Sequence, residues 1–242
     1  MSKRQEIRAR RRRAHIRNQI IVALVVVAGA VLVTFALILP MVNNARTAAN
    51  AASTPVVAIT PQAFNVKVDG VHLGDPSAPV KVDVYEDFRC SACRTYTQNI
   101  EPQVIKNYVE TGKVFYTFHS FIVIDGHDGS DASLRSANAA MCASEQNRFW
   151  DYHDTLYANQ ITEDASLFTD ARLTTMAENL KLDMTAFNQC YQAKKFASQI
   201  QQDIAQAITL KVTGTPSVFV NGTYVQDFQL TAQAIDNALA GK

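Results

Sequence analysis

The chain has 242 residues, and its 23 basic and 22 acidic side chains give a formal net charge of +1. That balance hides a division along the chain. Eight basic residues and one acid precede an apolar stretch near the N-terminus, which leaves 15 basic and 21 acidic residues, a net charge of −6, after it. An acidic balance gives no indication of a nucleic-acid partner. About 180 residues follow the N-terminal region, enough for one domain to bury a core without a structural metal or a dense disulfide framework.

The first element is the apolar stretch "IIVALVVVAGAVLVTFALIL", which runs from Ile20 to Leu39 without a charge. At about 1.5 Å per residue, a helix of this length crosses a hydrocarbon core of roughly 30 Å. We therefore predict a transmembrane helix over 20–40. A cleavable signal peptide is the alternative, but its apolar region runs over only about 7–15 residues, and the nearest small-x-small site, Ala49-Asn50-Ala51, lies well beyond the stretch.

Basic residues dominate the segment before this helix, 1–19, in which Glu6 is the single acid. The positive-inside rule predicts that such a segment stays in the cytoplasm, so that the chain crosses the cytoplasmic membrane once and everything after Leu39 lies outside. An arginine run can instead bind nucleic acid or act as a nuclear address, but its place directly before an apolar span favours the topological interpretation. The eight basic residues are Lys3, Arg4, Arg8, Arg10, Arg11, Arg12, Arg13 and Arg17.

After the span, residues 41–62 are rich in Ala, Asn, Thr and Pro and have no clear period, which predicts an extended linker. Residues 63–242 are then the outer domain. Because this domain is predicted to lie outside the cytoplasmic membrane, disulfides can form and persist in it.

The outer domain opens with a predicted strand, helix and strand. The segment "APVKVDVYEDF", 78–88, alternates valines as a strand does. The motif Cys-Ser-Ala-Cys follows at once, and apolar residues every four positions predict a helix that begins near the first cysteine and runs toward 111–113, with a kink at Pro102. A second strand is predicted over Val114–Val123, and the helix between the two strands implies a parallel crossover.

The remaining elements are a long helical stretch and a hairpin. Helices are predicted from about Ala132 to Leu210, and Asn221-Gly222 between two apolar runs predicts a two-residue hairpin turn. A closing helix is predicted to have Thr231 as its N-cap. One stripe of the helical stretch is expected to face the core: Phe196, Ile200, Ile204 and Ile208.

The Cys-x-x-Cys at Cys90 and Cys93 is compatible with a metal clip, haem attachment or dithiol chemistry. A zinc clip needs two further ligands at comparable spacing, and the sequence shows none. Haem attachment needs a histidine directly after the second cysteine, where this chain has Arg94. We therefore expect a redox-active pair that uses neither a metal nor another cofactor.

The predicted helix start gives the two cysteines different roles. Cys90 lies at the N-terminus of the helix, where unpaired N–H groups and the helix dipole favour a thiolate. Cys93 lies about one turn deeper on the same face, within disulfide reach but shielded. This arrangement predicts that Cys90 exchanges with a substrate sulfur and that Cys93 resolves the mixed disulfide.

Three motifs in order resemble the DsbA-like thiol:disulfide oxidoreductases of the thioredoxin superfamily, in particular their membrane-anchored or secreted bacterial branch. "VYEDFRCSAC" resembles the strand and redox motif of that branch, "SANAAMCASEQNRFWDYHDTLYANQ" its inserted helical domain, and "TGTPSVFVNG" its cis-proline loop and hairpin. The likeness covers residues 65–242. It implies an α/β thioredoxin fold with a helical insertion over about 128–210, preceded by one transmembrane helix.

The resemblance also implies roles for single residues. Thr215 and a cis Pro216 would face the cysteine pair and bind an extended substrate segment. Asp87 matches an acidic residue of the branch and would either relay the proton of Cys93 or only cap the helix. Phe149 and Trp150 are interpreted as insertion core.

The remaining two cysteines fall in the predicted insertion. Members of the branch carry a disulfide there, so the resemblance implies a structural Cys142–Cys190 disulfide. The alternative is two separate buried thiols.

The resemblance implies that the substrates are exported proteins with free thiols and that a membrane quinone reductase of the DsbB or VKOR kind reoxidises the pair. The sequence departs from the best-known oxidants, because Ser91-Ala92 replaces Pro-His between the cysteines. The direction of electron flow therefore stays open between a disulfide-forming oxidase and a reductase or isomerase. A non-catalytic binding module for unfolded exported chains is a third hypothesis.

Overall fold

The computed structural model of this chain describes residues 19–29, 32–36, 38–39, 42, 54–60 and 62–241. The chain divides into two compact units, Met1–Asn50 and Ala51–Lys242. In the first unit, the helix Gln19–Ala36 has a mean hydropathy of 2.6 and is long and apolar enough to cross a membrane. The basic residues predicted to set the orientation, and most of the predicted linker, lie outside the described residues.

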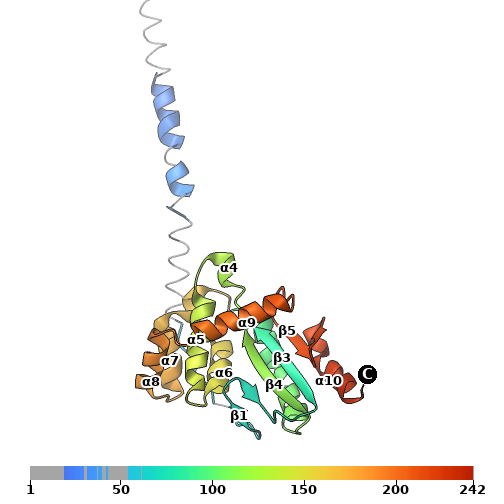
Figure 1. The fold of residues 1–242 in the computed structure, drawn as a ribbon. Helices are drawn as coiled ribbons and strands as arrows, with labels where there is room; N and C mark the ends of the chain where they lie inside the picture. Colours follow the sequence, from blue (N-terminus) through green and yellow to red (C-terminus); the bar gives the residue numbers. More distant parts are fainter. Residues whose placement is uncertain are drawn as a thin grey trace, which may run out of the picture. The chain divides into compact units, whose positions relative to one another are not determined.

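The second unit is built on a six-stranded mixed sheet with the order β1-β2-β4-β3-β5-β6 (Figure 1). Only β3 and β4 are parallel, and every other neighbouring pair is antiparallel. The strands are β1 (Val68–Asp69), β2 (His72–Leu73), β3 (Val80–Glu86), β4 (Val114–Ser120), β5 (Ser217–Val220) and β6 (Thr223–Val225).

Helices cover this sheet. In Figure 1, α5 to α8 lie together beside the sheet, α9 crosses over it, and α10 lies at the other edge. The α-helices are α2 (Ser91–Asn99), α3 (Glu101–Val104), α4 (Asp125–Asp128), α5 (Ala132–Ser144), α6 (Phe149–Asn159), α7 (Asp170–Asn179), α8 (Met184–Gln192), α9 (Ala197–Thr209) and α10 (Thr231–Leu239). A π-helix, η1 (Ile105–Val109), and two 3₁₀ turns, η2 (Ala165–Phe168) and η3 (Phe228–Leu230), complete the set.

The central strand β3 places the redox motif. Val80, Val82 and Val84 are fully buried, as their alternation predicts. The parallel register with β4 pairs Val82 with Tyr116, and the antiparallel register with β5 pairs Val84 with Val218. The predicted α/β thioredoxin fold is confirmed.

The helix after the redox motif is interrupted, as Pro102 predicted. Helix α2 ends at Asn99, and α3 begins at Glu101 with Pro102 in its first turn, where the missing N–H costs nothing. The chain therefore has two helices and a π-helical turn here, rather than one kinked helix.

Strand β4 ends three residues earlier than predicted, at Ser120 rather than Val123. The backbone N–H groups of Val123 and Ile124 bond to the Asp87 carboxylate at 2.8 and 2.9 Å, so they are not available to a strand partner. This side chain turns the chain away from the sheet.

The helical insertion consists of separate helices with short connections. Phe149 and Trp150 are buried in its core, as predicted. In the predicted apolar stripe, Ile200 is fully buried, whereas Ile208 is 64% exposed. The prediction was wrong for Ile208 because α9 packs on β4 along only part of its length.

The predicted hairpin turn at Asn221-Gly222 is confirmed. Both residues have positive φ, 47° and 76°, as a type I′ turn requires. The Asn221 side chain also accepts a hydrogen bond from the Lys81 backbone N–H at 2.8 Å, which ties the turn to β3.

The predicted N-cap of the closing helix was wrong. Thr231 is the first residue inside α10, and its hydroxyl donates to the Phe228 carbonyl at 2.6 Å. The preceding 3₁₀ turn, which the sequence did not predict, is capped instead by Asp227. The added turn shifts Thr231 from the cap position into the helix.

Part of the predicted linker lies against the domain. The Val57 backbone N–H donates to the Asn159 side-chain oxygen at 2.7 Å, and the Asn159 amide donates back to the Val57 carbonyl at 3.0 Å. Val56 packs against the core. Val57 is thus held to α6 by two hydrogen bonds with one side chain.

Candidate active site

Cys90 lies in the turn between the end of β3 at Glu86 and the start of α2 at Ser91. It is the N-cap residue of α2, with extended φ and ψ of −71° and 122°, and it is 7% exposed. Its backbone N–H bonds to the Asp87 carbonyl at 2.9 Å, which forms the tight turn between strand and helix. The sulfur is therefore placed at the unpaired N–H groups of the first helical turn.

Hydrogen bonds to the sulfur favour the ionised form of Cys90. The Cys93 thiol, the Thr215 side chain and the backbone N–H groups of Cys93 and Ala92 together outweigh burial and lower the pKa of Cys90 from 9.0 to about 6. At neutral pH the free sulfur is thus mainly a thiolate, the nucleophilic form.

Cys93 has the opposite environment. It is fully buried one turn into α2, and burial raises its pKa well above the ordinary value. Both cysteines are free thiols in this structure. One cysteine of the pair is thus reactive toward the surface and the other is shielded and protonated, which is the division predicted from the spacing.

The loop before β5 lies against this pair. The Thr215–Pro216 peptide bond is cis, and the Cys90 thiol is 3.2 Å from the Thr215 carbonyl oxygen, to which it can donate. The structure therefore brings together Cys90 and the loop that the sequence placed 125 residues away. A reactive thiol, a buried partner and a cis-proline loop now form one site.

Comparison with known proteins gives this site a family. A family model described as Thioredoxin matches residues 66–239. The chain belongs to the thioredoxin family.

Relatives narrow the assignment within the thioredoxin family. The chain is 35% identical over 171 residues to the probable disulfide bond formation protein D of Bacillus cereus, covering 69% of this chain and 77% of that protein. It is 25% identical over 174 residues to disulfide bond formation protein D of Bacillus subtilis, covering 70% and 77%. This thioredoxin-family chain is a DsbA-like protein thiol:disulfide oxidoreductase, and the predicted resemblance is confirmed.

Solved structures share the fold. Oxidised BdbD from Bacillus subtilis superposes with a TM-score of 0.64 at 23% identity, covering 78% of this chain and 100% of that one. The α-DsbA1 of Wolbachia pipientis gives a TM-score of 0.61 at 23% identity, covering 74% and 97%. The helical insertion is thus part of the fold that this thioredoxin-family chain shares with them.

Asp87 is fully buried below the turn, and its carboxylate is occupied by backbone groups. It accepts from the N–H groups of Arg89, Val123 and Ile124 at 2.8 to 2.9 Å. None of these three N–H groups belongs to α2, so the capping interpretation of Asp87 was wrong. Asp87 instead joins the turn before Cys90 to the loop after β4.

Glu86, one residue earlier, is the carboxylate whose negative charge acts on the Cys93 thiol. It is buried, and it accepts a hydrogen bond from the Tyr157 hydroxyl at 2.5 Å, while its second oxygen has no partner within the described residues. Glu86 is not among the site residues predicted from the sequence. The strand pattern could have indicated it, because the alternation of Val80, Val82 and Val84 places position 86 on the same buried face, where an acid is unusual.

Glu86 belongs to a buried polar cluster with Glu101 and His153, in which one potential ligand atom of each lies within 4.8 Å of the others. Burial raises the pKa of Glu101 to about 8. Burial lowers the pKa of His153, but the charge of Glu101 and hydrogen bonds to Asp154 and Glu86 outweigh it and raise the pKa to about 10. The cluster therefore holds protons at neutral pH.

Arg89 organises the rim of the site, although only 1% of it is exposed. Its guanidinium pairs with Asp125 at 2.9 Å and Asp128 at 2.5 Å, and its Nε donates to the Glu163 carbonyl at 2.9 Å. Gln160 donates to the Arg89 carbonyl. One side chain thus binds both the short helix α4 and the loop at Glu163, beside Cys90.

Cys142 and Cys190 lie apart from the redox site, in α5 and α8. They form a disulfide with an S–S distance of 2.03 Å, and both are buried. This pair links two helices of the insertion across 48 residues of sequence.

His119 links the insertion to the sheet. Its ring nitrogens lie 3.0 Å from Asp83 on β3 and 3.5 Å from Asp203 on α9. Burial lowers its pKa, but hydrogen bonds to Asp203 and Asp83 outweigh this and raise it to about 9. His119 is therefore a structural residue.

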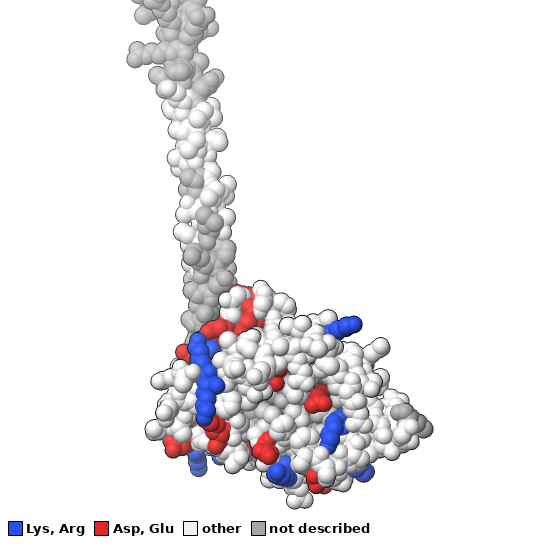
Figure 2. Space-filling view, in the orientation of Figure 1, with Lys and Arg blue, Asp and Glu red and all other residues white. Residues whose placement is uncertain are grey.

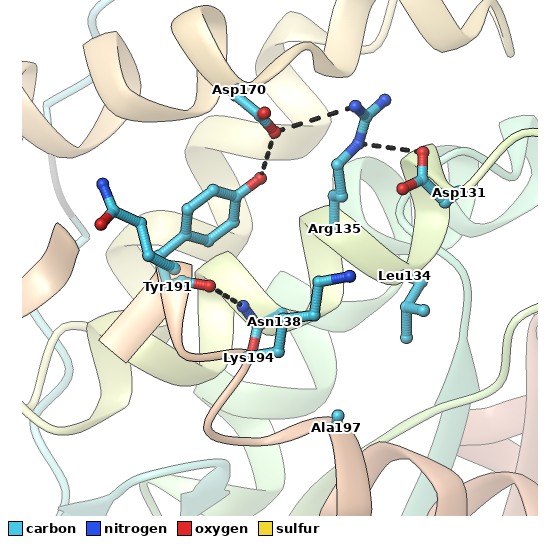
Figure 3. A pocket seen from close by; sticks show the side chains of 9 residues that line it. Asp131, Leu134, Arg135, Asn138, Asp170, Tyr191, Lys194 and Ala197 are labelled. Atoms are coloured by element: carbon cyan, nitrogen blue, oxygen red, sulfur yellow. Dashed lines mark hydrogen bonds and ion pairs between the residues drawn. The ribbon is translucent and has the colours of Figure 1, made fainter. Parts of the chain in front are cut away.

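The insertion also has a cavity of about 330 Å³, in which Tyr191 donates to Asp170 at 2.7 Å and Arg135 lies between Asp131 and Asp170 (Figure 3). None of the residues that line this cavity belongs to the redox site. On the face shown in Figure 2, the described charges of both signs are scattered among uncharged residues, without a continuous basic surface.

Proposed function

We propose that this DsbA-like oxidoreductase is a membrane-anchored enzyme that introduces disulfides into exported proteins. The observation that carries the proposal is the lowered pKa of Cys90 beside the shielded Cys93. A stabilised thiolate favours the reduced form of the pair, so the disulfide form is a ready oxidant. The same difference favours a redox enzyme over a non-catalytic binding module.

The proposed reaction begins with the Cys90–Cys93 disulfide. A substrate thiolate attacks the Cys90 sulfur, the bond between Cys90 and Cys93 breaks, and its electron pair leaves on Cys93. A second substrate thiolate then attacks the substrate sulfur of the mixed disulfide, and Cys90 leaves as a thiolate. The substrate dithiol has become a disulfide, and the enzyme pair has taken up two electrons.

Cys93 must take up a proton when it leaves, because a fully buried thiolate is costly. From the sequence, Asp87 was one candidate for this step, beside a role as helix cap, and a relay role for Asp87 stays a proposal. Three backbone N–H groups occupy its carboxylate, whereas Glu86 has a free buried oxygen and acts electrostatically on Cys93. We therefore favour Glu86 as the group that exchanges a proton with Cys93. Glu101 and His153, in the same buried cluster, would supply protons to Glu86.

Substrate binding is assigned to the loop at Thr215 and Pro216. Its backbone approaches Cys90, so an extended substrate segment can pair with it and present a sulfur to Cys90. This is the proposed role of the two loop residues, besides the hydrogen bonds that Thr215 makes to the sulfur.

Location and reoxidation complete the proposal. The apolar helix Gln19–Ala36 fits a single-pass anchor, and the basic residues before it support an orientation with the catalytic domain outside the cytoplasm. A membrane quinone reductase of the DsbB or VKOR kind would reoxidise the pair. A membrane partner suits an enzyme that is itself tethered to the bilayer.

The test is the reduction potential of Cys90–Cys93 in the full chain in detergent, equilibrated against glutathione and read from free thiols. We expect a value between about −120 and −180 mV, the range of strong oxidants and isomerases. A value near −270 mV, where thioredoxin lies, would instead indicate a reductase. A Cys93→Ser variant should trap the mixed disulfide with a reporter substrate, and a Cys90→Ser variant should not.

A further inference from the structure

Glu163 lies at the N-terminus of the redox helix, although it belongs to the insertion. Its carboxylate accepts from the Ser91 backbone N–H at 3.0 Å and from the Ser91 hydroxyl at 2.9 Å. Ser91 is the first residue of α2 and directly follows Cys90. A carboxylate from another part of the fold therefore bonds to the helical turn that stabilises the reactive sulfur.

The position of Glu163 is fixed. The buried Arg89 guanidinium donates to its backbone carbonyl, and Gln160, three residues earlier, donates to the Arg89 carbonyl. Arg89 is itself anchored by Asp125 and Asp128. The Glu163 carboxylate is thus held against Ser91 by backbone contacts that do not depend on its charge.

Two anions share the first turn of α2. The N–H groups of Ala92 and Cys93 bond to the Cys90 sulfur, and the N–H of Ser91 bonds to Glu163. Both gain from the positive end of the helix, and each opposes the charge of the other. In the disulfide form the Cys90 sulfur carries no charge, so this opposition exists only in the reduced enzyme.

We propose that Glu163 is a positioning residue that sets the redox equilibrium of the pair, because its charge opposes the Cys90 thiolate and so favours the disulfide over the dithiol. The proposal deepens the disulfide-forming function proposed above and rests on it. It also gives Ser91 a role, since the residue between the cysteines binds the carboxylate that tunes them.

Two other charged groups near Cys90 are held by partners of their own. The guanidinium of Arg89 is directed to Asp125 and Asp128, and the carboxylate of Asp87 is bound by backbone N–H groups. The remaining two are Glu86, buried on the side of Cys93, and Arg94, which is partly buried on α2. Among the charged side chains in the described part of the chain, Glu163 is the one with a direct hydrogen bond to Ser91.

The experiment compares the full chain with Glu163→Gln in detergent. Glutamine keeps an oxygen that can accept both Ser91 bonds, so only the charge is removed. We expect the pKa of Cys90, read from the pH dependence of thiolate absorbance, to fall by about half a unit, because Glu163 is exposed and water and salt screen its charge. At pH 7 this shifts the equilibrium with glutathione about threefold toward the dithiol, or about 14 mV at 29.6 mV per tenfold.

The matched control is Glu178→Gln, which removes the same charge from an exposed residue of α7. It should leave both readouts at the parent values, and high salt should shrink the Glu163 effect. Equal behaviour of the two variants, or a rise in the Cys90 pKa in Glu163→Gln, would overturn the proposal. The readout is a difference from the parent, so a parent potential near −270 mV would refute the oxidase function while leaving the Glu163 effect measurable.

Discussion

The two cysteine pairs of this chain are both buried, yet they differ in chemistry. Cys142 and Cys190 come from two helices of the insertion and are joined as a disulfide, whereas Cys90 and Cys93 share one helical turn and are free thiols. Burial is common to both pairs. What differs is the supply of hydrogen-bond donors, since the first turn of α2 offers unpaired N–H groups to Cys90. Reactivity therefore follows from position on a helix and not from exposure alone.

The largest expected effect tests the structural pair. The double variant Cys142→Ala, Cys190→Ala should lose about 4 kcal/mol of unfolding free energy, because the loop closed by the disulfide is long. Denaturant unfolding of the oxidised protein measures the loss. The Cys90 pKa should stay near 6 in the folded variant. A shift of that pKa would show that the two pairs are coupled.

The next effect concerns the redox pair and is measured as the pH dependence of the unfolding free energy of the reduced protein. The folded pKa of Cys90 is lowered from 9.0 to about 6, so its thiolate stabilises the reduced protein fully above pH 9, and this contribution is lost as the pH falls through 6. The reduced form should gain about 2 to 4 kcal/mol between pH 6 and 9 relative to the oxidised form, in which the sulfur does not titrate. Unfolding of both forms across this range measures the gain, and parallel curves would contradict it.

A smaller effect is expected for the hydrogen bond between Tyr157 and the buried Glu86. Tyr157→Phe removes the hydrogen bond to the buried Glu86 carboxylate and should cost about 2 kcal/mol, because a buried acceptor loses its donor. It should also change the pH dependence of Cys93 alkylation in a Cys90→Ala background. If stability falls while Cys93 is unaffected, Glu86 is structural and does not exchange a proton with Cys93.

The smallest effect is expected for Glu101→Gln. The folded pKa of Glu101 is raised to about 8, so the folded protein binds more protons than the unfolded chain between about pH 4.5 and 8, and stability falls as the pH rises through that window. Glutamine resembles the protonated acid and can still accept from Tyr116. We expect a change below about 1 kcal/mol at pH 5 and a flatter pH dependence of stability above it. A large loss at pH 5 would show that Glu101 acts as a carboxylate.

Local sequence was sufficient for elements whose cause is local. Asn221-Gly222 supplies the positive φ angles of its turn, and Pro102 interrupts its helix without help from neighbours. It was insufficient where a distant side chain intervenes. Strand β4 ends at Ser120 because the N–H groups of Val123 and Ile124 bond to the Asp87 carboxylate. Ile208 is exposed because α9 extends beyond the part of the sheet on which it packs.

The site divides in the same way. The spacing of Cys90 and Cys93 predicts their unequal environments, because both belong to one helix. Glu86, His153 and Glu163 were missed, since their roles depend on strand β3, α6 and an insertion loop meeting around α2. Only the buried face of β3 carried a usable signal, an acid where an apolar residue is expected.

Arg89 has a consequence for protein engineering. Because its guanidinium binds α4 and the Glu163 loop, while its neighbour Cys90 begins α2, the active-site turn is bonded directly to the insertion at several points. If the insertion were replaced by that of a relative, cut only where it begins and ends in the sequence, the buried Arg89 guanidinium would lose its acceptors beside the reactive sulfur. A working graft must include the acceptors of Arg89. The segment to exchange is therefore defined by the residues that bond to Arg89, and not only by the two points where the insertion begins and ends in the sequence.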